Sequence, residues 1–300
     1  MKKYLICLFV VLLFGCQPKE RITVMLPQGS PEMTVLGLSD KDYRLDMILG
    51  PDSLVAAFGS QSHDVIIAPT NLGAKLFQSK ETYQLAAVLV WGNYHLVSTS
   101  FQSLELSEVQ GKDILVFGQN QTSDIIIKHL LNAFSIDANV TYVDSVANAA
   151  ALYLNDPTKV VMVAEPSLSR LKSLVPETKS IDLQTLYQSL YGSNAYPQAG
   201  LFIKQGLSTV KVNQLLEDIA SSITSVNAKE EKLLERGVAW GLAPDKDIFS
   251  SAIDGSHLFF AKPEDVMDDI HTYFSIILDM NPGLIGGSLP NDRFYWSDVQ

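Results

Sequence analysis

The chain of 300 residues is 47% hydrophobic and carries a net charge of −11, with 22 lysines and arginines against 33 aspartates and glutamates. An acidic surface repels phosphate backbones and anionic lipid headgroups, which argues against nucleic acid as a partner and against membrane docking through a basic patch. A chain of this length is better served by two lobes than by one, and this composition can supply a large core.

The N-terminus is expected to be a secretion signal. Two lysines precede an apolar run at residues 4–14, which is shorter than the roughly 20 residues that span a bilayer. The ending Leu13-Phe14-Gly15-Cys16 resembles the lipobox of bacterial lipoproteins. That resemblance implies a signal peptide at residues 1–15, lipid on Cys16 and a lipidated tether at residues 16–20; an uncleaved anchor helix is the alternative. We therefore expect an extracytoplasmic protein, held by lipid to the membrane of a bacterial cell envelope.

Cysteine and metal chemistry are not expected in the mature protein. The two cysteines, Cys7 and Cys16, lie within the signal or at its end, so neither a disulfide, a thiolate metal site nor a cysteine nucleophile is expected. No two of the five histidines have the spacing of a metal pair on one helix face. We expect no metal and no cofactor.

Short apolar runs alternate with helical patterns along the rest of the chain. The first part predicts strands at 21–26, 43–49, 64–68, 85–91 and 96–99, and helices at 32–38, 52–58 and 72–77. The later part predicts strands at 114–117, 140–143, 160–164 and 200–203, and helices at 104–109, 123–133, 147–154, 210–226, 229–236 and 263–278. Such an alternation predicts an α/β protein with mostly parallel sheets covered on both faces.

Two strand ends carry hydroxyl residues where a helix begins. Thr70 and Asn71 follow the strand at 64–68, and Thr122 and Ser123 follow the strand at 114–117. Ligands of open α/β sheets bind outside the carboxyl ends of the strands, where helix N-termini present unpaired N–H groups. One such site in each lobe predicts a cleft that grips a small polar molecule from both sides. Ordinary helix capping is the alternative.

Several segments resemble, in their order, the solute-binding lipoproteins of ABC importers, in particular the group that binds nitrate, sulfonates, taurine and thiamine precursors. The resemblance covers residues 21–280 and is carried by residues 51–58, 64–71, 104–112, 114–117, 118–123, 163–166 and 196–202.

This resemblance implies a two-lobed type II periplasmic-binding-protein fold. Each lobe has a mostly parallel sheet flanked by helices, and two crossover strands form a hinge that closes on ligand. Lobe I would comprise residues 21–99 and 199–300, and lobe II residues 100–198. The permease and the ATPase would be separate chains, because this one has neither a membrane domain nor a phosphate-binding loop of the ATPase type. We expect a monomer without catalytic residues.

The candidate ligand-binding residues are those expected at the cleft: Gln28, Ser30, Pro69, Thr70, Asn71, Trp91, Asn93, Gln119, Gln121, Thr122, Ser123, Glu165 and Tyr196. For Trp91 and Tyr196, a place in the hinge core is as good an interpretation as contact with the ligand. The Glu165 carboxylate favours an amine or amidine, with a helix cap or a hinge hydrogen bond as its alternative role. Because Asp124 already sits in a first helical turn and no arginine lies near these positions, the expected ligand is small, nitrogen-containing, and neutral or zwitterionic.

Two other functional classes remain open. An enzyme resembling those of the menaquinone pathway uses the same fold, with His95 and Glu165 as the plausible pair. A sensory or adhesion lipoprotein without a transporter is the other alternative. The aromatic tail Phe294-Tyr295-Trp296 is expected to pack onto the body, with partner docking as its alternative.

Overall fold

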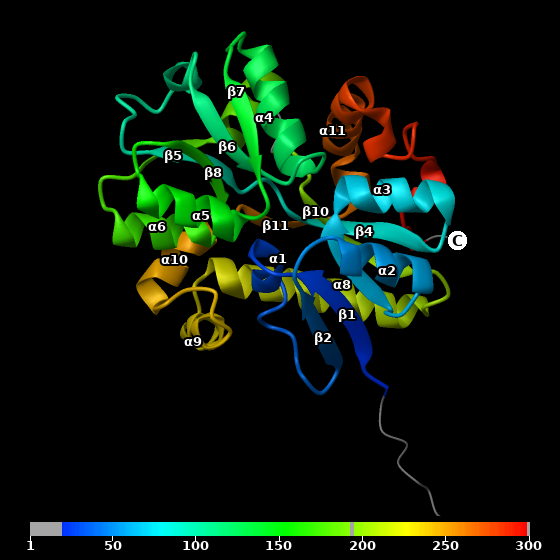
Figure 1. Cartoon of the computed structure of the whole chain (residues 1–300). Coiled ribbons are helices and arrows are strands. Elements are labelled where there is room, and N and C mark those ends of the chain that lie inside the picture. The colour runs from blue at the N-terminus through cyan, green and yellow to red at the C-terminus, as the bar shows by residue number, and fades with distance from the viewer. Residues whose placement is uncertain (1–19, 193–194, 299–300) are drawn as a thin grey trace, which may run out of the picture.

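The computed structural model describes residues 20–192 and 195–298, arranged as two lobes side by side (Figure 1). The predicted signal peptide and Cys16 lie outside the described residues. Throughout the described ranges, every helix falls short of the length and apolar character needed to cross a membrane. The expected two-lobed α/β class is confirmed.

The first sheet has six strands in the order β11-β4-β10-β3-β1-β2. Its strands are β1 (Ile22–Pro27), β2 (Tyr43–Ile48), β3 (Val65–Pro69), β4 (Tyr83–Val90), β10 (Ala199–Lys204) and β11 (Leu258–Ala261). Strands β1, β2 and β3 are parallel, whereas β10 runs antiparallel to both β3 and β4. The carboxyl ends of β1, β2, β3 and β4 therefore share one edge of the sheet.

The second sheet has five strands in the order β7-β6-β8-β5-β9. Its strands are β5 (Tyr94–Ser98), β6 (Asp113–Phe117), β7 (Asn139–Val143), β8 (Val160–Ala164) and β9 (Lys179–Asp182). Strands β6, β7 and β8 are parallel and β5 is antiparallel to β8. The first residue of β5 thus lies beside the last residue of β8.

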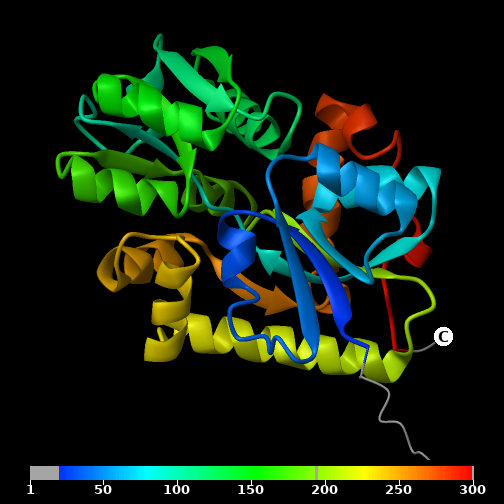
Figure 2. The ribbon, with the colours of Figure 1, turned by 60° about the horizontal axis from the view of Figure 1, so that its bottom comes forward.

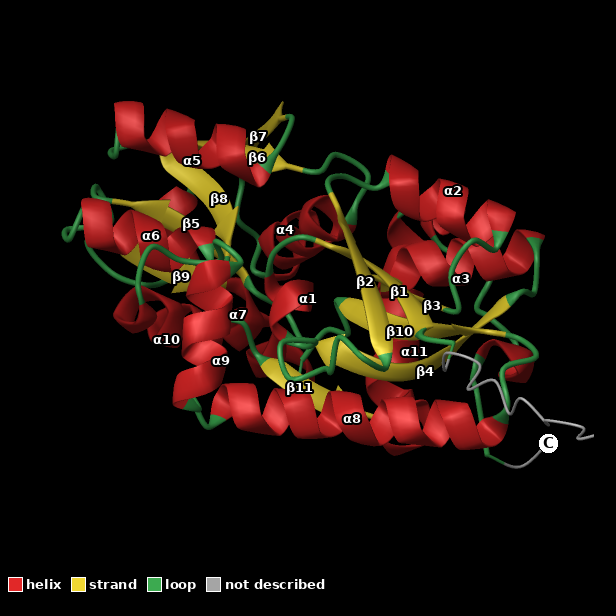
Figure 3. Cartoon of the chain, turned by 90° about the horizontal axis from the view of Figure 1, so that it is seen from below, coloured by secondary structure: helices red, strands yellow, loops and turns green. Residues whose placement is uncertain are grey.

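Helices cover both faces of the two sheets (Figure 3). They are α1 (Ser30–Met33), α2 (Asp52–Ser60), α3 (Thr70–Ser79), α4 (Thr122–Ala133), α5 (Val146–Asn155), α6 (Ser167–Leu174), α7 (Leu183–Tyr191), α8 (Thr209–Asn227), α9 (Glu231–Ala239), α10 (Lys246–Gly255) and α11 (Met267–Met280), with short 3₁₀ turns at Leu106–Val109, Pro263–Asp265, Pro282–Leu284 and Asp292–Phe294. Helix α8 lies along the first sheet (Figures 2 and 3) and buries Val212, Leu216, Ile219 and Ile223. This spacing of three and four residues places one apolar stripe against the sheet.

The chain changes sheets between Val90 and Tyr94 and returns to the first sheet at Ala199. We expected the second lobe to begin at Ser100, but β5 already pairs with β8 and β9 in the second sheet. An apolar run shows that a strand exists without showing which sheet it joins, so the sequence could not place the first crossover within a few residues. The return at Ala199 coincides with the expected start of the later part of lobe I.

Two stretches contain elements that we did not predict. Helices α6 and α7 flank the four-residue strand β9, and α10 precedes the four-residue strand β11. These strands are too short for an alternating pattern to be recognised. Conversely, the helix expected at 32–38 is only the short α1, followed by turns.

The C-terminal tail packs onto the first lobe, as expected. Phe294 is fully buried, Tyr295 forms an isolated bridge with Leu85, and the Trp296 amide donates to the Leu85 carbonyl at 2.9 Å. The tail therefore completes the core beside β4.

Candidate functional site

The two sheets meet through the polar side chains that we predicted at their strand ends. Asn71 is the second residue of α3, and Thr122 is the first residue of α4. The Thr122 hydroxyl donates to Asn71 Oδ1 at 3.2 Å, and both side chains are buried. The structure thus brings the N-termini of two helices, one from each lobe, into direct contact.

Neither helix start is capped by a side chain. The residues preceding α3 and α4, Pro69 and Gln121, make no capping hydrogen bond, whereas Ser145 and Ser208 cap α5 and α8 in the usual way. The first-turn N–H groups of a helix have no partner within the helix. The Thr70 amide donates to the Gln198 carbonyl at 3.2 Å, and the other first-turn amides of α3 and α4 present hydrogen-bond donors and partial positive charge to the junction.

The two threonines for which ordinary capping was the alternative, Thr70 and Thr122, are the first residues of α3 and α4, not the residues in the capping position before them. Thr70 Oγ1 donates to the Pro197 carbonyl at 2.5 Å, which ties α3 to the second crossover segment. Ser123 Oγ donates to the Phe117 carbonyl at 2.5 Å, at the end of β6. Both hydroxyls thus position the strand-to-helix turns.

A directed chain of hydrogen bonds connects both crossover segments to α1 and α10. Gln198 Nε2 donates to Asn93 Oδ1 at 2.8 Å, and Asn93 Nδ2 donates to Ser30 Oγ at 2.7 Å. Ser30 Oγ donates to Ser256 Oγ at 3.0 Å, which in turn donates to the Ala252 carbonyl at 2.7 Å. Each side chain in this series of hydrogen bonds has a partner. Ser30 and Asn93 therefore link segments at the lobe junction.

Glu165 turns its carboxylate onto the helix that follows it. Its two oxygens accept from the Ser169 amide at 3.1 Å and from the Ser169 hydroxyl at 2.9 Å. Its carbonyl oxygen lies 3.3 Å from Ser30 Oγ, across the junction. Burial raises the pKa of the Glu165 carboxyl to about 7, against the lowering effect of the Ser169 hydrogen bonds. This geometry matches the capping role given above as the alternative to an amine contact.

The two candidate aromatic residues lie in the hinge core. Trp91 is 2% exposed, and its Nε1 donates to the Phe259 carbonyl at 2.8 Å. Tyr196 is fully buried, with its ring centroid 6.2 Å from that of Tyr94 and 6.3 Å from that of Tyr273. Both rings therefore pack between the crossover segments and the adjoining helices.

The remaining candidates are less buried than those above. Gln28, Gln119 and Gln121 are exposed, and Pro69 is half-buried. Asp124 is buried beside them, and it accepts from Tyr142 Oη at 2.6 Å and pairs with Lys128 at 2.9 Å. The charge of this acid is thus balanced within its own lobe.

A cluster of titratable groups at the junction, with His95 buried and Asp182 and His257 partly exposed, was not predicted from the sequence. Asp182 lies 4.0 Å from His95 Nδ1 and 3.5 Å from His257 Nε2. Burial lowers the pKa of His95 to about 4, so this imidazole is neutral at pH 7. Burial opposes ionisation of Asp182, but the hydrogen bond from His257 and the neighbouring imidazoles hold its pKa at about 2. These residues are distant in sequence, so only the fold reveals the cluster.

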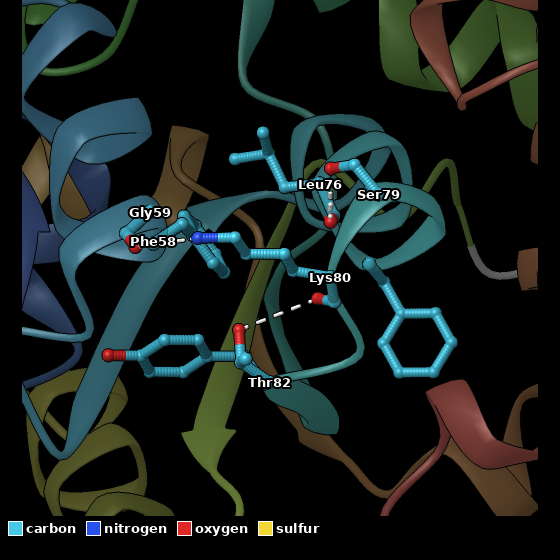
Figure 4. Close-up of a pocket in the computed structure, with 8 residues that line it drawn as sticks. Phe58, Gly59, Leu76, Ser79, Lys80 and Thr82 are labelled. Atoms are coloured by element: carbon cyan, nitrogen blue, oxygen red, sulfur yellow. Dashed lines mark hydrogen bonds between the residues drawn. The ribbon is translucent and has the colours of Figure 1, made fainter.

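Three cavities lined by described residues lie away from the candidate ligand-binding residues. One of about 30 Å³ lies between the ends of α2 and α3 and the start of β4, where Lys80 Nζ donates to the Gly59 carbonyl at 3.4 Å (Figure 4). Room for one or two waters is all that this volume offers. Grooves of about 630 and 530 Å³ lie beside the C-terminal tail and along α11. None of the thirteen candidate residues lines any of these three cavities.

Solved structures resemble this chain over nearly its whole length. An ABC transporter structure from Parabacteroides distasonis has a TM-score of 0.80 at 16% identity, covering 92% of this chain and 99% of its own. The periplasmic aliphatic sulphonate-binding protein SsuA of Escherichia coli has a TM-score of 0.72 at 12% identity, covering 94% and 93%. The zinc-bound ligand-binding component of an ABC-type import system from Staphylococcus aureus has a TM-score of 0.68 at 11% identity, covering 93% and 97%.

These identities establish the fold alone. The chain has the periplasmic-binding-protein fold, and its resemblance to transporter binding proteins is confirmed at that level. No family model and no curated protein sequence matches it. Within the described residues, no group of three or more histidine, cysteine, aspartate or glutamate side chains is placed to hold a metal ion.

Proposed function

We propose that this protein is an extracytoplasmic solute-binding protein that delivers a small, nitrogen-containing or zwitterionic ligand to an ABC importer. The permease and the ATPase are separate chains, and the protein is a monomer held to the membrane by lipid on Cys16. The first crossover lies at residues 91–93, so lobe II begins with β5 at Tyr94 and extends to residue 198, and lobe I comprises the chain from residue 21 to the crossover together with residues 199–300. The protein has no catalytic activity of its own.

The contact between Asn71 and Thr122 carries this proposal. A hinge protein binds its ligand where groups from both lobes converge, because only such contacts distinguish the closed from the open arrangement. The uncapped N-termini of α3 and α4 supply backbone donors at that point. A carboxylate, sulfonate or carbonyl oxygen of the ligand would accept these hydrogen bonds.

The charges around the junction favour a ligand without large net charge. Arg236 is bonded to the Leu36 carbonyl and to Asp40, and Arg293 to Glu81, both away from α3 and α4. Lys128 already pairs with Asp124. Because no arginine of the described residues reaches the two helix starts, a multiply charged anion would lack a counter-charge. The exposed Gln28, Gln119 and Gln121 supply neutral amides instead.

The geometry gives the enzymatic alternative no support. A general acid–base pair has to aim at one reacting atom. The Glu165 carboxylate is bonded to Ser169, whereas His95 lies against Asp182. The Glu165 carboxylate is thus held by Ser169, and neither ring nitrogen of His95 has a hydrogen-bond partner among the described residues, so the two side chains that we considered do not form a hydrogen-bonded catalytic pair.

A thermal-shift screen tests the proposal. The chain from Gln17 onward, which contains every described residue, is melted with pyrimidines, thiamine precursors, sulfonates, amino acids or nitrate. A ligand at 100 times its dissociation constant adds about 2.7 kcal/mol, which raises the melting temperature by several degrees. We expect at least one class to produce this shift.

Two variants locate the effect. Thr122→Trp fills the space between α3 and α4 and should abolish the shift, whereas Thr141→Trp on the exposed face of β7 should retain it. Melting each variant without ligand establishes that it is folded. A panel without any shift, or a shift that survives Thr122→Trp in folded protein, would contradict the proposal.

A further inference from the structure

Glu165 is covered by residues from the other side of the lobe junction. A Cβ atom on Gly255, the last residue of α10, would lie 2.6 Å from Glu165 Oε1 and 3.0 Å from its Cγ. Ser30 Oγ, at the start of α1, approaches the Glu165 carbonyl to 3.3 Å. Glu165 itself directly follows β8 of the second sheet. Its burial therefore depends on how closely α1 and α10 approach the second lobe.

Burial disfavours the ionised form of Glu165 and outweighs the start of α6, which favours a negative charge through the two hydrogen bonds from Ser169. Helix α10 ends at Gly255, and the C-terminus of a helix carries partial negative charge. Ser169 donates two hydrogen bonds to the carboxylate, and the cations that act on it are Lys172 of α6 and His257 after α10. Of these, Lys172 is exposed, and His257 already lies 3.5 Å from Asp182.

The other titratable groups of this junction are engaged elsewhere. His95 faces Asp182 from β5, at 4.0 Å, and is kept neutral by burial. Glu32 of α1 accepts from the Gly29 amide at 2.8 Å. No ion pair within 4 Å joins Glu165 to a cation among the described residues. Ionising Glu165 thus places a charge between two packed surfaces without a direct counter-ion.

We propose that Glu165 is a proton-sensitive contact of the lobe junction, which favours the closed arrangement when protonated and loosens it when ionised. For its role in solute capture, this inference rests on the proposed function. Capture and retention of the solute would then weaken as the pH rises through neutrality.

The sign and size of the effect follow from linkage. Separation of α1 and α10 from β8 returns the carboxyl to water, where its pKa is near 4.5, whereas burial in the closed arrangement raises it to about 7. The closed form therefore binds the proton more tightly, and closure becomes less favourable as pH rises from 4.5 to beyond 7. Between pH 5.5 and 8 the closed-to-open ratio should fall by roughly 25-fold.

A distance measurement between the lobes tests this without any solute. The chain from Gln17 onward contains no cysteine, so spin labels can be attached at Ser53→Cys on α2 and Ala147→Cys on α5, both exposed. Double electron–electron resonance then gives the populations of short and long distances. In otherwise unaltered protein, the short-distance population should decrease between pH 5.5 and 8.

Two variants identify the responsible group. Glu165→Gln preserves the shape and should remove the pH dependence, whereas His257→Gln should retain it. A population that does not change with pH, or a dependence that survives Glu165→Gln, would overturn the inference. If the pH dependence of the distance populations is lost only in His257→Gln, the effect belongs to the imidazole, which would also overturn the inference. Because no solute is present, this outcome is independent of the ligand screen.

Discussion

Replacement of Phe294 by alanine should remove a central part of the lobe I core. The Phe294 ring is fully buried, with centroids of neighbouring rings at 5.3 Å for Phe77, 6.0 Å for Phe202 and 6.1 Å for Phe274. These neighbours belong to α3, β10 and α11, which cannot all move inward to fill the space. We therefore expect a loss in the upper part of the usual range for such a change, about 3–5 kcal/mol.

Urea denaturation and thermal melting measure this loss. At about 2–4 °C per kcal/mol for a protein of this size, the melting temperature should fall by roughly 10 °C. Phe259→Ala is the matched control, because Phe259 is 55% exposed, and we expect it to cost less than about 1 kcal/mol. If Phe294→Ala proved as stable as the control, the tail would not belong to the core, and docking of a partner would again be its better explanation.

Two further predictions concern single positions. Because burial lowers the pKa of His95 from 6.5 to about 4, the unfolded chain binds this proton more readily. The free energy of unfolding should therefore fall by up to about 3 kcal/mol as the pH drops from 6.5 to 4. Denaturation curves of His95→Gln should lack this pH-dependent loss. If the loss is the same in His95→Gln, it does not come from His95. Gly73→Ala places a methyl group 2.0 Å from Phe202 Cζ and should destabilise by about 1–3 kcal/mol. Gly59→Ala in α2 meets nothing within 4 Å and should stabilise by about 0.5–1 kcal/mol, so equal melting temperatures for these two variants would contradict the packing described.

The sequence predicted helices and strands correctly where an apolar run or an apolar periodicity extended over enough residues to be recognised. The apolar run at 64–68 became β3, and the pattern at 210–226 became α8 with its buried stripe. Strand β9, with the sequence Lys179-Ser180-Ile181-Asp182, is too short and too polar to be recognised. Local patterns show where an element forms, but the sheet that it joins depends on contacts distant in the sequence.

The sequence indicated where the candidate residues lie in the fold better than it indicated their hydrogen-bond partners. Thr122 and Asn71 were chosen because they follow strand ends, and the fold brings them together. The partners of Asn93 could not be foreseen, because Ser30 lies 63 residues before it and Gln198 lies 105 residues after it. The role of Glu165 likewise depends on the close approach of Gly255.

Hydrogen–deuterium exchange with a solute identified in the screen tests the central claim most directly. Backbone amides in the first turns of α3 and α4, residues 71–72 and 122–124, should become protected when the solute binds, because they would donate to it across the junction. Protection confined instead to the groove beside the C-terminal tail, at residues 204–209 and 293–298, would place the solute elsewhere and contradict the account.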